Sequence, residues 1–228
     1  MSEAIVLLSG GLDSSTVLAL AKERGFEVVA LTFDYGQRHR RELESAKKVA
    51  SHFGVKKHIM LPLDIGKYLQ SSLTMKSKTV PVGRTRDQIA SGIPDTYVPS
   101  RNIIFLAIAS SIAESRGASA VFIAANSVDF SGYPDCTPEF MSAFQRVIDV
   151  GTKSGKLGRS ILVEAPFLTM TKGEIVREAL RLEVPLRLTW SCYEGGRKAC
   201  GRCDSCQLRL QGFVEAGAED PMEYEVRQ

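Results

Sequence analysis

A run of small polar residues directly after the first apolar segment could bind phosphate. Residues 5–8 are apolar, and Ser9, two glycines and an Asp-Ser-Ser-Thr run starting at Asp13 follow them. Glycine lets the backbone approach an anion, and the free N–H groups and dipole at a helix N-terminus favour negative charge. The hydroxyl groups add donors, and Asp13 could hold a magnesium ion. The run therefore predicts a phosphate-binding loop between a buried strand and a helix.

Two common phosphate-binding loops do not match this run. A Walker loop needs a lysine before its Ser or Thr, and a dinucleotide-binding loop needs a third glycine; the run contains neither. The remaining pattern is Ser-Gly-Gly-x-Asp-Ser. An ordinary glycine turn between a strand and a helix is the alternative, and the density of small residues disfavours it.

Four of the five cysteines are clustered near the C-terminus with the spacing C-x7-C-x2-C-x2-C. In a reducing compartment such a cluster indicates a metal site more readily than disulfides. Four thiolates with no open position are typical of a structural tetrahedral zinc site. An iron–sulfur cluster is the rival interpretation. The expected ligands are Cys192, Cys200, Cys203 and Cys206.

Arg101 and Cys136 each allow two interpretations. Arg101 opens an apolar run at 103–113, and its charge could be buried there only beside an anion, which makes it a phosphate candidate. It could instead cap the surface edge of that helix. Cys136 ends a polar loop and could act as a nucleophile, but we favour a small buried apolar residue.

The elements that must position these residues alternate between strand and helix. Apolar runs predict strands at 5–8, 27–33, 57–61, 120–125 and 161–163, and helical patterns follow from Asp13 and at 41–53, 103–113, 138–149 and 171–182. The run at 103–113 is apolar nearly all round, so we expect a buried helix. This order predicts an α/β fold with a doubly wound, parallel five-stranded sheet in which the first and fourth strands are neighbours.

Ligands bind beyond the carboxyl ends of the strands in such sheets. The loops at 9–15, 34–39 and 129–135 should therefore surround one crevice. Residues 64–99 show no clear periodicity and carry several basic residues, so we interpret them as a lid over the phosphate-bearing ligand, with a solvated insertion as the alternative. We expect a catalytic domain at 1–185 and a C-terminal zinc-binding appendage at 186–228.

The composition is ordinary for a globular protein, with 44% hydrophobic and 24% charged residues and a net charge of +3. This charge is too small to indicate a nucleic-acid-binding protein, although it suits an enzyme that handles nucleotides. No apolar stretch approaches membrane-spanning length, and the N-terminus lacks the pattern of a signal peptide. We expect a cytoplasmic protein.

Several motifs together resemble one enzyme family. Ser-Gly-Gly-x-Asp-Ser alone resembles the PP-loop of the ATP pyrophosphatases. With Phe33-Asp34-Tyr35-Gly36-Gln37-Arg38-His39, Val98-Pro99-Ser100-Arg101-Asn102, the loop from Asp129 to Cys136 and the four cysteines, the chain resembles the 7-cyano-7-deazaguanine synthase family from Ile5 to Phe213. Thr137 departs from the arginine that we expect in many members.

The resemblance implies an ATP-dependent ligase of queuosine biosynthesis. Members convert 7-carboxy-7-deazaguanine and ammonia into the nitrile through an adenylated acid and an adenylated amide. The resemblance implies Asp13, Ser14, Arg101 and Lys172 as catalytic residues and Tyr35, Asp129, Tyr133 and Asp135 as substrate-binding residues. The implied ATP-binding residues are Leu8, Ser9, Gly10, Gly11, Leu12, Asp13, Ser14, Ser15, Thr16, Val17, Leu18, Asp34 and Arg38.

The implied cofactors are one structural Zn²⁺ per chain and Mg²⁺ with ATP. The expected partners are small molecules and a second copy of the chain in a homodimer, with no stable nucleic-acid or membrane partner. Two alternatives remain: a PP-loop tRNA thiolase that carries sulfur on Cys136, and a zinc knuckle that serves as a nucleic-acid or protein interaction module.

Overall fold

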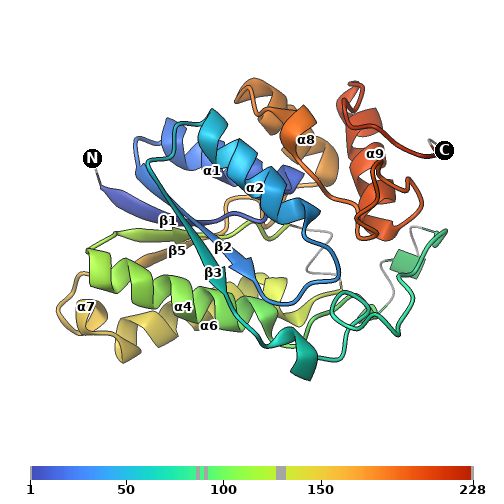
Figure 1. The fold of residues 1–228 in the computed structure, drawn as a ribbon. Helices are drawn as coiled ribbons and strands as arrows, with labels where there is room; N and C mark the ends of the chain where they lie inside the picture. The colour runs from blue at the N-terminus through green and yellow to red at the C-terminus, as the bar shows by residue number, and fades with distance from the viewer. Residues whose placement is uncertain (1, 86–87, 90–91, 127–131, 227–228) are drawn as a thin grey trace.

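The computed structural model describes residues 2–85, 88–89, 92–126 and 132–226. Its centre is a parallel five-stranded sheet in the order β3-β2-β1-β4-β5 (Figure 1). The strands are β1 (Glu3–Leu7), β2 (Glu27–Asp34), β3 (Lys57–Pro62), β4 (Ala120–Phe122) and β5 (Leu162–Glu164). In β1, Ile5 lies opposite Val29 of β2 on one side and Val121 of β4 on the other. The predicted fold class and the pairing of the first and fourth strands are confirmed.

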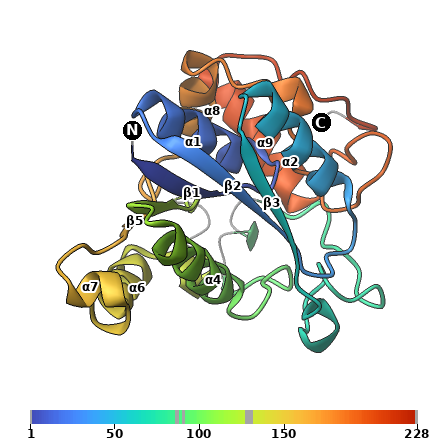
Figure 2. The same ribbon diagram turned by 60° about the vertical axis from the view of Figure 1, so that its left-hand side comes forward.

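Helices cover both faces of the sheet (Figures 1 and 2). The α-helices are α1 (Leu12–Glu23), α2 (Arg41–His52), α4 (Arg101–Arg116), α6 (Pro138–Gly151), α7 (Lys153–Lys156), α8 (Lys172–Arg181) and α9 (Asp204–Ala216). Short 3-10 helices lie at Gly66–Tyr68, Pro134–Cys136 and Leu186–Leu188. Helices α1, α2 and α8 lie on one face, and α4 and α6 lie on the other.

Alternation along the strands builds the two cores. Ile5 and Leu7 of β1 pack with Leu106 of α4 and Phe144 of α6 in one apolar cluster. Their neighbours Ala4 and Val6 face the opposite way and pack with α1, α2 and Ile175 of α8. Successive side chains of a strand point to opposite faces, so a sheet buried on both sides needs the continuous apolar runs of this sequence.

Two expected elements differ from the structure. Strand β4 ends at Phe122 and not at residue 125, and residues 123–125 line the cavities described below. Helix α4 is longer than expected, and it is not buried all round, since the side chain of Ile103 is 42% exposed. Its inner face, with Leu106 and Ala109, meets the sheet, and its outer face meets solvent.

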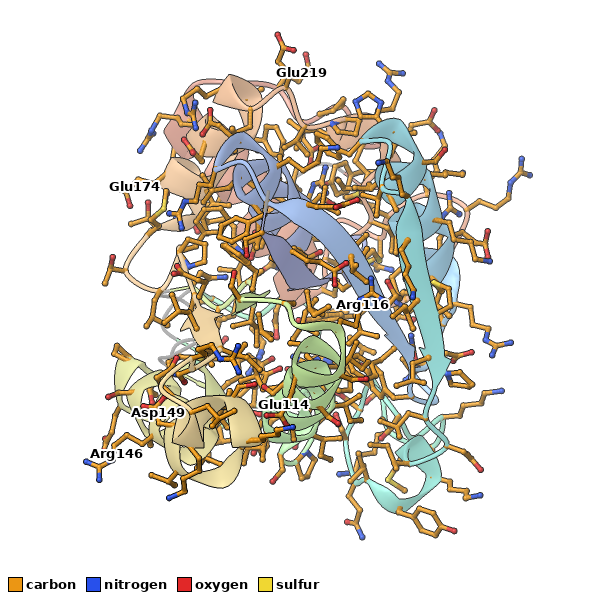
Figure 3. The ribbon with its side chains drawn as sticks, turned by 90° about the vertical axis from the view of Figure 1, so that its left-hand side faces the viewer. Glu114, Arg116, Arg146, Asp149, Glu174 and Glu219 are labelled. Atoms are coloured by element: carbon orange, nitrogen blue, oxygen red, sulfur yellow. The ribbon has the colours of Figure 1, made fainter. Side chains whose placement is uncertain are left out.

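The start of α8 is fixed by a capping box that places Lys172. The Thr171 hydroxyl accepts a hydrogen bond from the Glu174 N–H at 3.2 Å, and a carboxylate oxygen of Glu174 accepts one from the Thr171 N–H at 2.7 Å. These contacts satisfy two N–H groups at the helix start. Glu174 lies at the outer surface (Figure 3). Lys172 is therefore held as the first residue of a well-defined helix.

The C-terminal segment packs against α8 and against the long irregular segment that precedes α4. A Cβ placed on Gly173 of α8 would lie 2.6 Å from the Cβ of Glu215 in α9, so the two helices are in close contact. Val82 pairs with Cys203 in an antiparallel bridge, and Arg84 forms an ion pair with Asp204. Part of the segment 64–99 thus lies on the cysteine cluster; the domain division and the lid stay predictions.

Within the described residues, no helix combines the length and the apolar character needed to cross a bilayer.

Candidate functional site

The Ser-Gly-Gly loop lies between β1 and α1 and is organised by its own hydroxyl groups. The Ser9 and Ser14 hydroxyl oxygens are 3.0 Å apart, and the Ser9 N–H donates to the Ser14 hydroxyl at 3.2 Å. Gly11 is the N-cap of α1 and offers no side-chain cap, which leaves the first N–H groups of the helix for a ligand.

Gly10 cannot be replaced without moving the neighbouring helix. Its φ is +86°, and a Cβ there would lie 2.4 Å from the Glu42 carbonyl oxygen and the Ala46 nitrogen of α2. The Gly10 carbonyl oxygen accepts a hydrogen bond from the Trp190 N–H at 2.9 Å. The loop is therefore tightly packed between α2 and the C-terminal segment.

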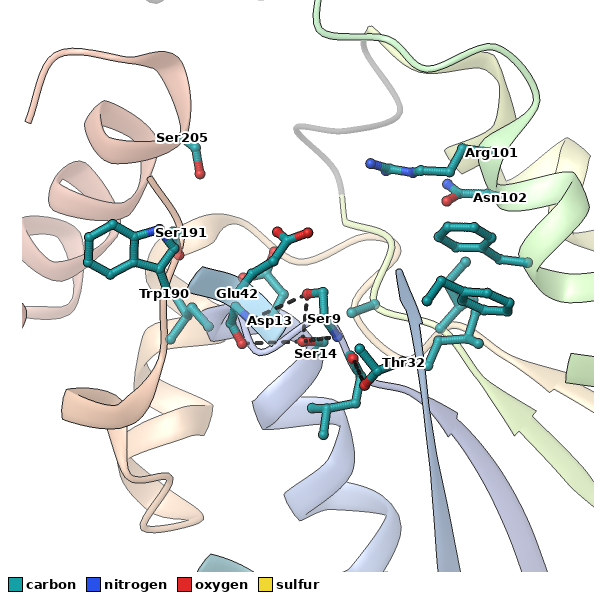
Figure 4. Close-up of a pocket in the computed structure, with 18 of the residues that line it drawn as sticks. Ser9, Asp13, Ser14, Thr32, Glu42, Arg101, Asn102, Trp190, Ser191 and Ser205 are labelled. Carbon is teal, nitrogen blue, oxygen red and sulfur yellow. Dashed lines mark hydrogen bonds between the residues drawn. The ribbon is translucent and has the colours of Figure 1, made fainter. Parts of the chain in front are cut away.

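A cavity of about 280 Å³ opens above this loop. The loop forms its floor, Arg101 and Asn102 of α4 lie on one side, and Trp190 and Ser205 lie on the other (Figure 4). The lining also includes Tyr35 after β2, Glu42 of α2, Lys172 of α8 and Arg209 of α9. The carboxyl ends of β1, β2 and β4 face this cavity, as expected for a doubly wound sheet.

Asp13 is the most heavily contacted acid of the cavity. Its Oδ2 lies 2.6 Å from Nζ of Lys172 and accepts a hydrogen bond from the Asn126 amide at 2.8 Å. Its Oδ1 is buried and has no hydrogen-bond partner among the described residues. A buried carboxylate oxygen without a partner is costly, so Oδ1 is suited to a donor or cation brought by a ligand.

Arg101 begins α4 and is anchored by two neighbouring segments. It forms a side-chain hydrogen bond with Tyr35, whose pKa is raised by burial. Asp135 fixes the helix start, since its Oδ2 accepts a hydrogen bond from the Asn102 N–H at 2.9 Å. The preceding residue, Ser100, has a φ of 55°, a strained value for a residue other than glycine. These contacts aim the guanidinium at the cavity.

A second cavity of about 110 Å³ adjoins the first and shares Arg101 and Asn102 with it. Tyr133, Tyr193 and Cys136 also line it. Cys136 is buried, and its Sγ accepts a hydrogen bond from the Asn102 side-chain amide at 3.1 Å. The two cavities could hold two ligands that meet at Arg101.

Most of the expected site residues converge on these cavities. The first is lined by Leu8, Ser9, Gly11, Leu12, Asp13, Ser14, Tyr35, Arg101 and Lys172, and the second by Arg101 and Tyr133. Gly10, Ser15, Thr16, Val17 and Leu18 are buried behind the loop; the hydroxyls of Ser15 and Thr16 donate to the carbonyls of Gly11 and Leu12 at 2.7 and 2.8 Å. Asp129 lies outside the described residues.

Two residues that were expected to bind ATP and one that was expected to bind the substrate make other contacts in the structure. Asp34 pairs with Arg40, and the Arg38 guanidinium donates to the Lys78 carbonyl oxygen at 2.6 Å. Asp135 supports α4 and lines neither cavity. A contact of these three residues with a ligand stays a prediction.

Glu42, in the first turn of α2, lines the cavity and was not expected there. Burial raises the pKa of its carboxyl group to about 7, although nearby Arg101 and a hydrogen bond from Gln37 lower it. In the sequence it resembles Glu44, which is a surface residue of the same helix. The close approach of Gly10 to α2 turns the first of these acids toward the cavity.

Arg209 was also missed. It is buried and forms an ion pair with Asp220, with Nε 2.7 Å from Oδ2. Its guanidinium also donates to the Thr189 hydroxyl at 2.7 Å and to the Ser191 hydroxyl at 3.3 Å. Arg209 thereby ties α9 to the segment that carries Trp190, the far wall of the cavity.

The four clustered cysteines form a candidate metal site. Their sulfur atoms all lie within 4.8 Å of one another, and Sγ of Cys200 and Cys206 are 3.9 Å apart. A tetrahedron with metal–sulfur bonds of about 2.3 Å has sulfur–sulfur edges of about 3.8 Å, which matches this spacing. The N–H groups of Glu194 and Cys200 point at Sγ of Cys192 at 3.4 and 3.3 Å. The site could hold one metal ion.

The metal site adjoins the cavity through Trp190. The indole N–H donates to the Cys192 carbonyl oxygen at 2.9 Å, and the Arg41 guanidinium lies 4.1 Å from the centre of the ring. Because the backbone N–H of Trp190 donates to the Gly10 carbonyl oxygen, this one residue links the cysteine cluster to the phosphate-binding loop.

Comparison with known proteins assigns the chain to a family. The model of the queuosine biosynthesis protein QueC family matches residues 3–217. The chain belongs to this family. QueC-family relatives named 7-cyano-7-deazaguanine synthase include one from Desulfitobacterium hafniense, 53% identical over 98% of this chain and 94% of its own length. Another, from Thermoplasma acidophilum, is 52% identical over 98% of this chain and 92% of its own length.

A solved structure supports the fold. The NMN synthetase from Francisella tularensis aligns with a TM-score of 0.50, at 14% identity, over 96% of this chain and 78% of its own. At this identity the likeness concerns the fold alone. The chain is thus an enzyme of the QueC family with a doubly wound, parallel α/β fold.

Proposed function

We propose that this enzyme converts 7-carboxy-7-deazaguanine, ammonia and ATP into 7-cyano-7-deazaguanine. A carboxylate resists attack by ammonia, so ATP first converts it to an acyl-adenylate and pyrophosphate leaves. Ammonia then displaces AMP to give the amide. Adenylation of the amide oxygen followed by elimination of AMP gives the nitrile. The joined cavities are the observation that carries the proposal, because they bring a phosphate-binding loop and Arg101 to one place.

The larger cavity is the proposed ATP site. The Ser9 and Ser14 hydroxyls and the free N–H groups of α1 would hold the departing pyrophosphate, and Lys172 and Arg101 would balance the charge that develops on it. Asp13 orients Lys172 through their 2.6 Å contact. The buried Oδ1 of Asp13 suits the Mg²⁺ that accompanies ATP, which would add positive charge at the phosphates.

The smaller cavity is the proposed site of the deazaguanine base. Tyr133 and Tyr193 offer aromatic surface, and Asn102 offers an amide. Arg101 lies between the two cavities, where it could bind the substrate carboxylate and the α-phosphate of ATP. Binding both reactants against one guanidinium would orient them for attack.

The metal is proposed to be one structural Zn²⁺ per chain. Four buried thiolates at the spacing of a single tetrahedral ion favour zinc. A four-iron cluster would hold the sulfurs farther apart, because the irons and sulfides lie between them. Zinc would fix the Trp190 wall of the ATP cavity and take no part in the reaction.

The proposed setting is the cytoplasm, with small-molecule partners. The cysteines form no disulfide among the described residues, which suits a reducing compartment. We also propose a homodimer, with the exposed Val147 and Val150 of α6 as candidate contact residues. The tRNA thiolase alternative is less favoured, because Cys136 is buried and bonded to Asn102.

The test is exchange of labelled pyrophosphate into ATP that depends on 7-carboxy-7-deazaguanine. Asp13→Asn should lower this exchange by about 10²-fold or more, since it removes charge that orients Lys172. Asp64→Asn is the matched control, because Asp64 is 79% exposed and pairs only with Lys67 among the described ion pairs. Normal exchange in Asp13→Asn, or none in the wild type, would contradict the proposal.

A further inference from the structure

Glu42 is an acidic residue in the ATP cavity that has no role in the proposed function. It lines the cavity beside the phosphate-binding loop, and its carboxylate points into the open space between Ser205 and Arg101 (Figure 4). A negative charge next to a site for ATP repels phosphate. Its position there needs an explanation.

A structural role in an ion pair does not account for Glu42. Among the ion pairs of the described residues, the acids near the cavity that have a cation partner are Asp13, Asp34, Asp204 and Asp220, and Glu42 is not one of them. Its hydrogen bond comes from the neutral amide of Gln37, which also donates to the Phe33 carbonyl oxygen at 3.3 Å. Because this amide is neutral, it can orient the Glu42 carboxylate without neutralising the negative charge.

We infer that Glu42 binds ammonium in the ATP cavity and takes a proton from it, so that neutral ammonia attacks the acyl-adenylate. This inference rests on the proposed function and names the site of its second substrate. Near neutral pH the donor in solution is mostly ammonium, which has no lone pair for attack. A carboxylate that is half-buried attracts a cation more strongly than one in water.

The proton balance requires such an acceptor. Acyl-adenylate and ammonium give the amide, AMP and two protons. One N–H proton passes to the Glu42 carboxylate, and the nitrogen lone pair then forms the C–N bond. The C–O bond to AMP breaks, its electron pair leaves with the phosphate, and that phosphate takes the second proton. Glu42 returns its proton to water before the next turnover.

The surroundings of Glu42 suit a group that gains and loses a proton near neutral pH. The charged groups around it are Arg101 of α4 and Asp34 at the end of β2, and Asp13, Lys172 and Arg209 also belong to the cavity or its edge. Burial is the largest influence and raises the pKa to about 7, Arg101 lowers it, and Asp34 raises it. A base with a pKa near the working pH is the most effective.

The experiment compares ammonium with hydroxylamine as the nucleophile. Hydroxylamine is largely neutral near pH 7.5 and needs no proton removed before it attacks. Preformed acyl-adenylate is mixed with each nucleophile in a single turnover, and the amide and the hydroxamate are measured by mass spectrometry. Glu42→Gln should lower amide formation by about 10²–10⁴-fold and hydroxamate formation by less than about threefold.

Glu44→Gln is the matched control. It makes the same chemical change two residues along α2 at a side chain that is 61% exposed, and both rates should equal those of the wild type. Equal losses with both nucleophiles in Glu42→Gln would mean that Glu42 only positions the site, and no loss would mean that it has no role. Either result overturns the inference. Absence of acyl-adenylate in the wild type would instead overturn the proposed function.

The pH dependence of the wild-type rate tests the inference without requiring that the Glu42→Gln variant folds. At limiting total ammonium, the wild-type rate should level off above pH about 7, where Glu42 is ionised. Without a base, the rate would keep rising with the concentration of free ammonia. A wild-type rate that rises tenfold per pH unit up to about pH 8.5 would overturn the inference.

Discussion

The buried pair between Arg209 and Asp220 should be essential to the stability of the C-terminal segment. Both side chains are at most 2% exposed, and two N–H groups of Arg209 donate to the Asp220 carboxylate at 2.7 and 3.0 Å. The carboxylate also accepts hydrogen bonds from the Met222 N–H and the Tyr224 hydroxyl. Asp220→Ala would leave a buried guanidinium without its counter-charge.

The magnitude follows from these contacts. Hydrogen bonds to charged groups contribute about 1.5–3 kcal/mol each, so the loss of the two that Arg209 donates gives about 3–6 kcal/mol. Truncation of one partner of a buried ion pair costs about 3–5 kcal/mol, which agrees. We expect Asp220→Ala to lower the free energy of unfolding by about 4 kcal/mol, a large part of the usual stability of a domain.

The assay is urea unfolding followed by the fluorescence of Trp190, the only tryptophan in the chain. Trp190 reports on the C-terminal segment, because its indole N–H donates a hydrogen bond to the Cys192 carbonyl oxygen and its backbone N–H donates one to the Gly10 carbonyl oxygen. Glu219→Ala is the matched control: Glu219 is adjacent but exposed at the surface (Figure 3), so its loss should change stability by less than about 0.5 kcal/mol. A loss below about 1 kcal/mol in Asp220→Ala would refute this reasoning.

Three further predictions concern the metal, Cys136 and pH. Cys203→Ser should lose the bound zinc, measured by elemental analysis, together with thermal stability and ATP binding, because the cluster supports Trp190; stoichiometric iron in the wild type would contradict the zinc assignment. Cys136→Ser should retain adenylation and nitrile formation, followed by mass spectrometry, since no sulfur passes through the enzyme; AMP release without amide or nitrile would show that the thiol is required. Burial raises the pKa of Glu42 from 4.5 to about 7, so the folded state binds a proton that the unfolded state releases between these values. The free energy of unfolding should therefore fall, by up to about 3 kcal/mol, as pH rises through this range, and urea titrations of Glu42→Gln should lack this fall. Equal slopes in the two proteins would contradict it.

The sequence predicted the elements whose signal is local. The apolar runs gave the strands, and their order gave the neighbouring positions of β1 and β4. The phosphate-binding loop and the metal site were also predicted, because each is formed by residues that lie close together in the chain. Arg101 was predicted at the start of α4, and it is the first residue of that helix.

The missed residues owe their roles to contacts between distant segments. Glu42 has the pattern of a surface glutamate and reaches the cavity because Gly10 packs on α2. Arg209 lies between two leucines of α9 and is buried by Asp220 and Thr189. The segment around Val82 and Arg84 has no periodicity, and its place on the cysteine cluster depends on Cys203 and Asp204.

The most direct test of the central claim is one product analysis. The purified enzyme is incubated with ATP, ammonium and 7-carboxy-7-deazaguanine, and the base and the nucleotides are identified by mass spectrometry. The account predicts 7-cyano-7-deazaguanine, with two molecules of AMP formed for each nitrile and the amide as the intermediate. Formation of ADP in place of AMP, a sulfur-containing product, or an unchanged acid with ATP intact would contradict it.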